Sequence, residues 1–442
     1  MCAEMLGPED WEPGGAASGA RERARRREQR RLEREQNVTR RPRTPRALRS
    51  SGLLATRSGR MLAGATALLA VATAIGLAAL WPGAHHRHGP SQAFGGKTLA
   101  AKVVAIVERQ CPGPVPQSCR QLRVRLDQGP GRGAVERLTL GPANLTSSFS
   151  AGDSIRVTKV QAPPGAHVKE PYTFAGLDRR GTLIWLVIAF AVLVVVLARW
   201  RGALALAGFA ISLLLVTKFL IPALLAGSAP LLVAVVGALA VMFVTVGLTY
   251  GLSAQSAAAA LGIAGSLLFA GIVGTIAVHS ARLDGRSGEL SSFLAAANSN
   301  VSLQGIVLAG LVLGALGVLA DMGVTQASAV MALRRASPDL PPRRVFREAF
   351  SVGRDHLVAT THTLVLAYVG ATLPLLLVLQ SSGVNTVDAL NAQDVAEPIV
   401  ATLVGAMALL VCVPITTGLA TALVARIPAE ALPEGHAGHH HD

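Results

Sequence analysis

Eight apolar runs of roughly 20 residues constrain the fold of this chain more than any other feature. Each run is long enough to cross a hydrocarbon core of about 30 Å as an α-helix. The chain is 51% hydrophobic and only 15% charged, a balance that indicates an integral membrane protein. The sequence therefore predicts an all-α polytopic membrane protein with about eight transmembrane helices. The runs lie near 61–82, 181–199, 203–222, 229–250, 256–279, 301–322, 356–380 and 398–425.

The first run follows an arginine-rich segment, so it is either a membrane helix at 60–82 or a long signal peptide. Its length and the lack of a clear small-x-small cleavage site at Trp81-Pro82 favour the helix. Positive residues are retained on the cytoplasmic side of a membrane. An N-terminus inside and eight crossings place the arginines near 199–201 and at 334–354 inside as well. We therefore expect a multi-pass protein of the bacterial inner membrane with both termini cytoplasmic.

The two ends of the chain are polar. Residues 1–59 are rich in arginine in a chain with net charge +15, and they predict a disordered cytoplasmic tail that attracts anionic lipid. No aromatic residue is interleaved with these arginines, so a nucleic-acid partner is not expected. Histidines gather at 85–88 and in the cytoplasmic tail 427–442. Loose imidazole clusters bind transition metals weakly, so neither a metal site nor a cofactor is predicted.

The segment 83–180 lies between the first two runs and holds the one domain expected outside the membrane. Glycine- and proline-bearing turns separate its β-rich or alternating stretches. They predict a small β-rich extracytoplasmic domain at about 97–165, either a barrel or a sandwich. Cys111 and Cys119 flank a proline-rich loop there, and an oxidising compartment would permit a disulfide; a free thiol pair or a metal site is the alternative. The stretches are 98–107, 121–126 and 154–160.

Polar and ionisable side chains cluster in the sixth and seventh runs, where they are costly to place in lipid. At about 100° per residue, the members on each helix share one face or lie on the adjoining face. The two polar faces would meet if these helices pack together. We predict that they line a pathway through the membrane. The pathway residues are Asp321, Thr325, Gln326, Ser328, Asp355, His356, Thr360, His362 and Thr363.

Two interpretations of these residues are open. Carboxylate and imidazole groups change protonation under modest shifts of environment, so Asp321, Asp355 and His356 would bind or relay a cation or proton. The threonines and Gln326 would then serve as neutral ligands. Alternatively, the two aspartates are interfacial helix caps or partners of the nearby arginines.

The last run contains Pro414 followed by Thr416 and Thr417. A proline with adjacent threonines inside a bilayer helix predicts a kink whose freed carbonyl is satisfied locally. Broken helices expose backbone groups that transporters use to coordinate ions. The alternative is that the proline has a structural role only.

Several polar motifs inside the apolar runs resemble a known family. They are DMGVTQASAV in the sixth run, VGRDH and TLVLAYVGATLPLLL in the seventh, and VPITTGLA in the eighth. Over about residues 60–427 the chain resembles the YibE/F family of bacterial multi-pass membrane proteins, in its actinobacterial form. The resemblance implies an inner-membrane protein with an external β-rich insert after the first span. It implies no established biochemical activity.

The chain departs from that family pattern at two positions. Ala320 stands where similar members often carry a second acidic residue, and His362 stands where they carry an asparagine. A divalent-ion site that needs paired carboxylates would be weakened by Ala320. His362 would supply a polar ligand with added pH sensitivity.

Three function classes follow from these observations. We predict a secondary transporter or channel for an ion or small solute through the polar pathway. The chain carries no nucleotide-binding motif, so transport would be secondary, channel-like or driven by a separate ATPase subunit. The alternative is a non-transporting accessory or scaffold subunit that binds a partner membrane protein through its external β domain. An enzyme is not expected, because no G-x-S-x-G, H-E-x-x-H or phosphate-binding motif is present.

Overall fold

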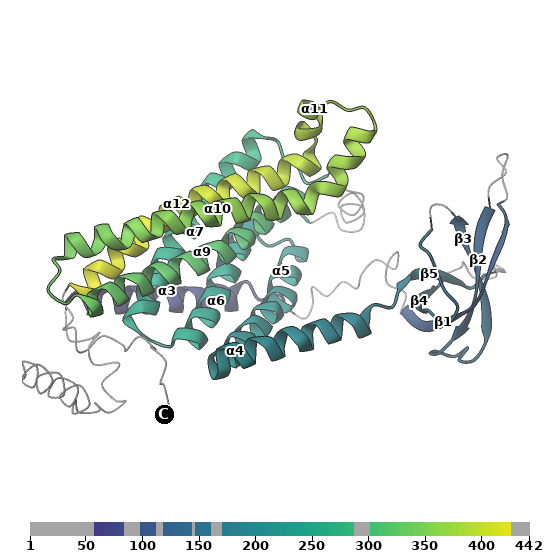
Figure 1. Ribbon diagram of the computed structural model, residues 1–442, viewed down its shortest axis with the longest axis horizontal. Coiled ribbons are helices and arrows are strands. Elements are labelled where there is room, and N and C mark those ends of the chain that lie inside the picture. Colours follow the sequence, from purple (N-terminus) through teal and green to yellow (C-terminus); the bar gives the residue numbers. More distant parts are fainter. Residues whose placement is uncertain are drawn as a thin grey trace, which may run out of the picture. The chain divides into compact units, whose positions relative to one another are not determined.

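The structure is a computed structural model that describes residues 57–83, 98–111, 118–143, 146–160, 170–286 and 301–425. The predicted tails at 1–59 and 427–442 lie outside these residues, apart from 57–59, which begin the first helix. The histidine clusters lie outside them too. The described chain is mostly helical, with a small β domain between the first helix, α3, and the next, α4 (Figure 1).

Within the described residues, seven helices are long and apolar enough to cross a membrane. Each apolar run predicted above overlaps one of them over most of its length, and α9 and α10 extend well beyond the runs. Counting all described helical elements, including the short α5 and α11, the helices are α3 Arg57–Ala79, α4 Arg180–Leu215, α5 Ile221–Leu225, α6 Pro230–Tyr250, α7 Ala254–Ser280, α9 Leu303–Ala336, α10 Pro342–Ser381, α11 Thr386–Asn391 and α12 Gln393–Val424. A π-helical turn at Val216–Leu220 joins α4 to α5.

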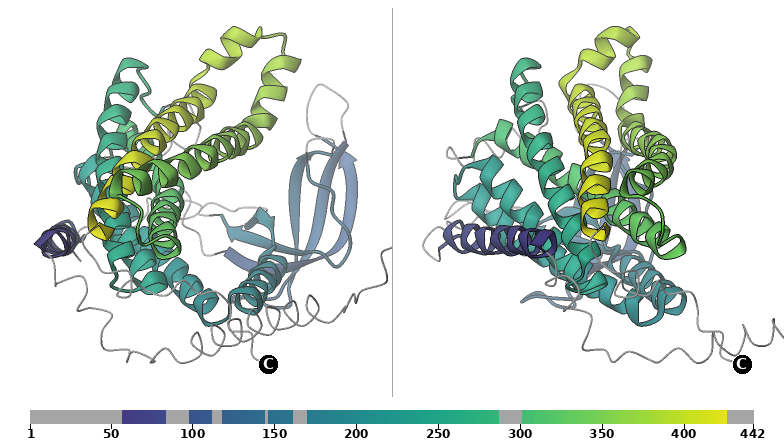
Figure 2. Two further views of the ribbon diagram at one scale, coloured as in Figure 1. Left: turned by 60° about the vertical axis from the view of Figure 1, so that its left-hand side comes forward. Right: turned by 90° about the vertical axis from the view of Figure 1, so that its left-hand side faces the viewer.

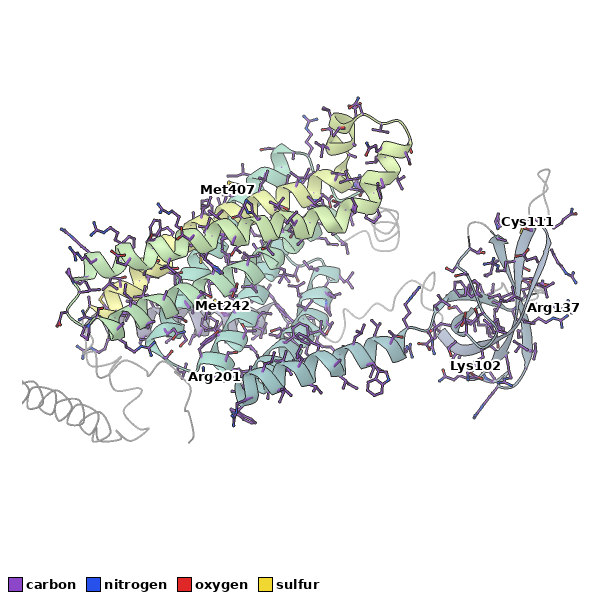
Figure 3. All side chains as sticks on the ribbon, viewed as in Figure 1. Lys102, Cys111, Arg137, Arg201, Met242 and Met407 are labelled. Atoms are coloured by element: carbon purple, nitrogen blue, oxygen red, sulfur yellow. A yellow bond between two sulfur atoms is a disulfide. The ribbon has the colours of Figure 1, made fainter. Side chains whose placement is uncertain are left out.

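The number is seven because the predicted spans 181–199 and 203–222 fall in one continuous segment, Arg180–Leu225. As a straight helix its 46 residues would measure about 69 Å, more than twice the hydrocarbon thickness. The segment is not straight, since Arg199 has φ 54° and ψ −136°. A Cβ at Gly202 would collide with the Val194 carbonyl oxygen, so only glycine fits just after the break. The ribbon changes direction sharply at this point, beside the labelled Arg201 (Figure 3).

The main buried core of the helical part is formed by α6, α7, α9 and α12. α7 packs against both α9 and α12, and these helices run side by side in Figures 1 and 2. The close approach depends on small residues, which let backbones come together in a membrane. A Cβ added at Gly262 of α7 would lie 2.9 Å from Cβ and 3.1 Å from Cα of Thr416 in α12.

α4 and α10 are packed differently from these core helices. No residue in the most apolar stretch of either helix is buried inside the described protein. Large apolar side chains such as Trp185, Leu186 and Leu366 are exposed. In a bilayer such surfaces contact lipid, because helices satisfy their own backbone hydrogen bonds there.

The β domain is a single antiparallel sheet with strand order β3-β2-β1-β4-β5. Its two edge strands, β3 and β5, also contact each other, so the sheet curls into a partly open barrel around one apolar core. The predicted stretches correspond to β1, β2 and β4. β3 and β5 were not predicted, and β5 lies beyond the expected end of the domain at 165. The strands are β1 Thr98–Gln110, β2 Ser118–Leu126, β3 Val135–Pro142, β4 Ser154–Lys159 and β5 Tyr172–Leu177.

A disulfide joins Cys111 to Cys119, with an S–S distance of 2.13 Å and Cα atoms 4.9 Å apart. It links the end of β1 to the start of β2 at the tip of the hairpin, where Cys111 is labelled in Figure 3.

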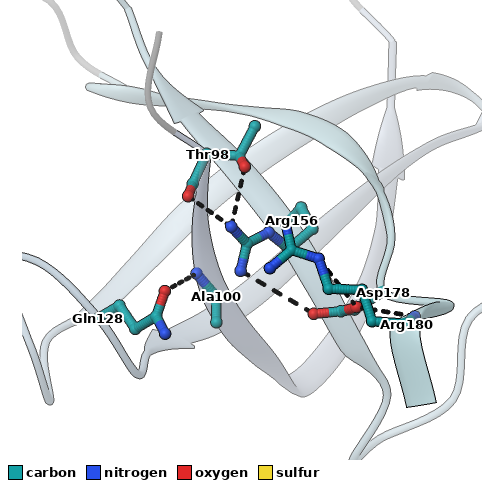
Figure 4. Close-up of polar contacts among 6 residues, drawn as sticks. All are labelled: Thr98, Ala100, Gln128, Arg156, Asp178 and Arg180. Atoms are coloured by element: carbon teal, nitrogen blue, oxygen red, sulfur yellow. Dashed lines mark hydrogen bonds and ion pairs between the residues drawn. The ribbon is translucent and has the colours of Figure 1, made fainter. Parts of the chain in front are cut away.

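Two residues separate β5 from α4, and the first of them, Asp178, fixes this junction. Its backbone N–H donates to the Ser154 carbonyl at 2.9 Å, and its carboxylate accepts from the Arg180 N–H at 3.1 Å. The same carboxylate lies 3.9 Å from Nη1 of Arg156. Arg156 in turn donates through Nη2 to the Thr98 carbonyl at 2.6 Å (Figure 4). The start of α4 is thereby linked to β4 and, through Arg156, to β1.

Candidate functional site

An exposed stripe runs along α9 and carries two of the predicted pathway residues. Asp321 and Thr325 share it with three preceding glycines at intervals of three or four residues. All five residues are exposed, while the opposite face of α9 is buried in the core. We call this set the Asp321 stripe. Its members are Gly310, Gly314, Gly317, Asp321 and Thr325.

The stripe is open over most of its length. A Cβ added at Gly310 or Gly317 would have no atom within 4 Å. At Gly314 the Tyr368 hydroxyl of α10 would lie 2.9 Å from such a Cβ. On the α6 side, Asp321 lies within electrostatic range of Tyr250, as does Arg201. The Tyr368 hydroxyl therefore stands beside Gly314, and Tyr250 of a different helix lies near the Asp321 end of the stripe.

The geometry does not support a cap or arginine-partner role for Asp321. α9 begins at Leu303 and ends at Ala336, so Asp321 is inside the helix rather than at an end. Arg334 donates to the carbonyls of Pro338 and Leu340 in the connector after α9. Within the described chain, no hydrogen bond or ion pair holds the Asp321 carboxylate.

Gln326 lies on the other side of α9, in the core, and is only 2% exposed. Its Nε2 donates to the Ala349 carbonyl of α10 and to Oγ1 of Thr417 in α12, both at 2.7 Å. Gly353 of α10 leaves room for the amide, since a Cβ there would lie 2.8 Å from the Gln326 Cδ. We call Gln326, Ala349, Gly353 and Thr417 the Gln326 hub. It joins three helices and does not face the stripe.

Ser328 is also engaged in packing. It accepts a hydrogen bond from Nε2 of Gln255 in α7 and donates to the Val324 carbonyl of its own helix at 2.8 Å. The Ser328 hydroxyl therefore ties α9 to α7. Its predicted role as a pathway ligand would require this contact to open.

The predicted residues of α10 lie at the surface of the helical part. Asp355, His356, His362 and Thr363 are exposed, and Thr360 is half-buried. The Thr360 and Thr363 hydroxyls donate to carbonyls one turn earlier in α10, at 2.9 and 3.1 Å. No described hydrogen bond or ion pair connects these residues to the Asp321 stripe. α10 meets α9 instead through Tyr368, the Gln326 hub and an apolar cluster in which Phe350 and Leu357 pack with Met322. The pathway role of the α10 residues therefore stays a prediction.

Helix α12 continues through Pro414, and its two threonines are packing groups. Thr416 is completely buried against Gly262 of α7. Thr417 donates to the Val413 carbonyl at 2.6 Å while accepting from Gln326. The predicted kink at Pro414 stays a prediction.

Sequence reasoning did not single out the residues that flank the stripe or shape the hub. Tyr250 and Tyr368 are two of only three tyrosines in the chain, which was the one available signal. Gly353 lies in a charged segment before the seventh apolar run, where nothing distinguishes it from a linker glycine. Among the described residues, no group of three or more His, Cys, Asp or Glu side chains is placed to hold a metal ion.

Comparison with protein families matches residues 186–426 to the YibE/F-like proteins. Comparisons with curated proteins and with solved structures found no match. The matched region begins inside α4, so it contains the Asp321 stripe and the Gln326 hub but not the β domain. It is narrower than the 60–427 expected from the sequence motifs, yet it covers more than half of the chain. The chain therefore belongs to the YibE/F-like protein family.

Proposed function

We propose that this protein is a transporter or channel that passes an ion or small solute along the Asp321 stripe. One observation supports this most directly: an exposed carboxylate and hydroxyl stand among open glycine positions on a helix long enough to cross a bilayer. A carboxylate against lipid is costly, and such groups usually face a water-filled cavity or a protein partner. The Asp321 carboxylate is therefore best stabilised by contact with water or a polar solute.

The chemistry of the stripe suits a cation or a proton. A carboxylate holds either, and a nearby charge or dehydration changes its proton affinity. Glycines without close neighbours leave backbone carbonyls within reach of a passing solute. The hydroxyls of Thr325, Tyr250 and Tyr368 add neutral donors and acceptors at the borders.

We further propose eight crossings of the bacterial inner membrane with both termini cytoplasmic. The break at Arg199 would be a tight cytoplasmic turn between two crossings, and its arginines follow the positive-inside rule. A single cysteine at position 201, in a variant without the other cysteines, tests this. It should resist a membrane-impermeant thiol reagent in intact cells and react after lysis. Labelling in intact cells would contradict the topology.

The test of transport is a flux assay on purified protein in liposomes. Proton and simple-cation fluxes are measured under a pH gradient for the wild type and for Asp321→Asn, which keeps the shape and removes the charge. We expect a flux that falls at least about tenfold, equivalent to about 1.4 kcal/mol. Asp388→Asn, in the short surface helix α11, is the matched control and should leave the flux unchanged.

A second variant, Asp355→Asn, distinguishes a pathway along the Asp321 stripe from a pathway along the exposed face of α10. Full flux in this variant and loss in Asp321→Asn supports the stripe. The reverse pattern would place the pathway along α10. A wild-type protein that is folded and passes none of the tested ions would argue for the accessory role.

The accessory role has its own structural support. Gly310 and Gly314 have the small-xxx-small spacing that lets a second helix pack closely in a membrane. A cysteine at position 310, in a variant without the other cysteines, distinguishes the two functions. Reaction with a water-soluble thiol reagent in proteoliposomes indicates a hydrated pathway. Protection there, together with cross-linking to another protein in native membranes, would indicate a docked helix.

A further inference from the structure

The β domain has the strand connectivity of an OB-type barrel. β1 pairs with both β2 and β4, β2 pairs with β3, and β4 pairs with β5. The contact between β3 and β5 closes the ring in the order β1-β2-β3-β5-β4. In barrels of this type, the face formed by strands 2 and 3 is a common surface for charged or polar polymers.

Among the exposed cations on the outer side of β1, β2 and β3, four stand in two directly opposed pairs. We call Lys102, Arg123, Arg125 and Arg137 the basic face; all four are exposed. Lys102 is the register partner of Arg125, and Arg123 is the register partner of Arg137. Directly opposed residues have Cβ atoms about 5 Å apart, and like charges in that position destabilise a sheet. Figure 3 labels Lys102 and Arg137 on this domain.

The four cations of the basic face outnumber the carboxylates beside it, of which Glu170 is held at Thr139. In the described part of the chain, no ion pair joins any of its four residues to an acid. Glu136 precedes Arg137 but is the register partner of the fully buried Val124, so it turns to the other side of the sheet. Glu170 is bonded to Thr139, at 3.0 Å to its backbone N and 2.6 Å to its hydroxyl.

We propose that the basic face binds a soluble polyanion with repeated phosphate groups. Arginine binds phosphate through two parallel hydrogen bonds, and three of the four residues are arginine. β1, β2 and β3 contain no aromatic residue, so nucleic-acid bases have no surface on which to stack. The face therefore recognises the charge pattern of a polymer rather than bases.

The position of the face in the sheet favours a soluble polymer over lipid headgroups. β5 is the strand that continues into α4. β2, at the centre of the basic face, is separated from β5 by β1 and β4 on one side of the ring and by β3 on the other. The basic face is thus formed by β1, β2 and β3, whereas the strand that continues into the membrane helix α4 is β5.

The test uses the full-length protein in nanodiscs of zwitterionic lipid, titrated with fluorescently labelled inorganic polyphosphate. We expect binding that weakens with salt. The double variant Arg123→Gln with Arg125→Gln should lower the affinity at least about tenfold and reduce the salt slope by about one for each phosphate that is no longer neutralised. The matched control is Lys159→Gln with Arg179→Gln, which removes the same charge from exposed positions outside β1, β2 and β3.

Thermal stability gives an independent readout. Removing one of two opposed cations relieves their repulsion, so Arg125→Gln should unfold at a temperature equal to or above that of the wild type. Equal loss of affinity in the two double variants, or no binding at low salt, would overturn the proposal. It would also be overturned if anionic nanodiscs alone abolished polyphosphate binding, because lipid headgroups would then be the ligand.

Discussion

Gly353→Ala is the sharpest test of the Gln326 hub. In an ordinary helix interior, alanine in place of glycine stabilises the fold by about 1 kcal/mol. At position 353 the added Cβ would lie 2.8 Å from Cδ and 2.9 Å from Nε2 of Gln326. Carbon atoms in favourable contact are about 3.5–4.0 Å apart. At position 353 the substitution should therefore lower the stability of the fold instead of raising it.

The size of that loss follows from what Gln326 must give up. The side chain is enclosed, and moving its amide breaks hydrogen bonds to Ala349 and Thr417. Losing both bonds costs about 2 kcal/mol, and any overpacking that remains once the amide has moved adds up to about 1 kcal/mol, the lower end of the usual range. After subtracting the gain of about 1 kcal/mol from helix propensity, we expect a net destabilisation of about 1–2 kcal/mol.

The assay is thermal unfolding of the purified protein in detergent, monitored by circular dichroism. Gly370→Ala is the matched control on the same helix, because its Cβ would meet no atom within 4 Å; it should be neutral or stabilising. A double-mutant cycle then isolates the interaction. In a Gln326→Ala background the clash is gone, so Gly353→Ala should become stabilising, with a coupling of about 2–3 kcal/mol. Equal effects in both backgrounds would refute the hub.

Three further predictions concern other parts of the structure. Gly262→Ala should lower the unfolding temperature by a free-energy loss of about 1–3 kcal/mol, because its Cβ meets the backbone of Thr416; an unchanged transition would refute the close packing of α7 on α12. Cys111→Ser should destabilise the β domain by about 2–3 kcal/mol, and mass spectrometry of the alkylated, unreduced wild type should show neither thiol of this pair free. The backbone N–H of Arg286 donates to Asp284 and lowers the pKa of that carboxyl. The carboxylate thus stabilises its turn above the unfolded pKa, and this stabilisation is lost as the pH falls through the lowered value. The hydrogen-exchange protection factors of 281–286, which are corrected for the pH dependence of intrinsic exchange, should fall there in the wild type but stay constant in Asp284→Asn.

The membrane helices were largely predictable because lipid imposes long apolar runs. The run at 229–250 became α6, Pro230–Tyr250, with a shift of one residue at its start. α10 shows the limit, since it begins at Pro342 rather than near 356. Its first turns are charged, and only Val345, Ala349 and Gly353 of that part are buried. A criterion of continuous hydrophobicity cannot detect a helix that leaves the apolar layer.

The sequence predicted which residues of the candidate site share a face of α9, but not whether that face is buried or exposed. Periodicity placed Asp321 and Thr325 on one face of α9, and the structure leaves that face exposed. Gln326 is one residue further on, about 100° around the helix, and it is buried. α9 is apolar on several sides, so composition alone could not say which side meets the core. The neighbours from α6, α10 and α12 decide this, and they are distant in sequence.

The junction at Asp178 limits where the barrel can travel. Two residues extend at most about 7 Å, so the end of β5 stays close to the start of α4 at Arg180, and α4 is long and apolar enough to cross a membrane. A polymer held by the barrel would then drift with the protein in the plane of the bilayer instead of through the surrounding volume. Short tethers of this kind raise the local concentration of a bound partner to about the millimolar range. Capture by a few surface charges would be enough to enrich such a polymer beside the membrane.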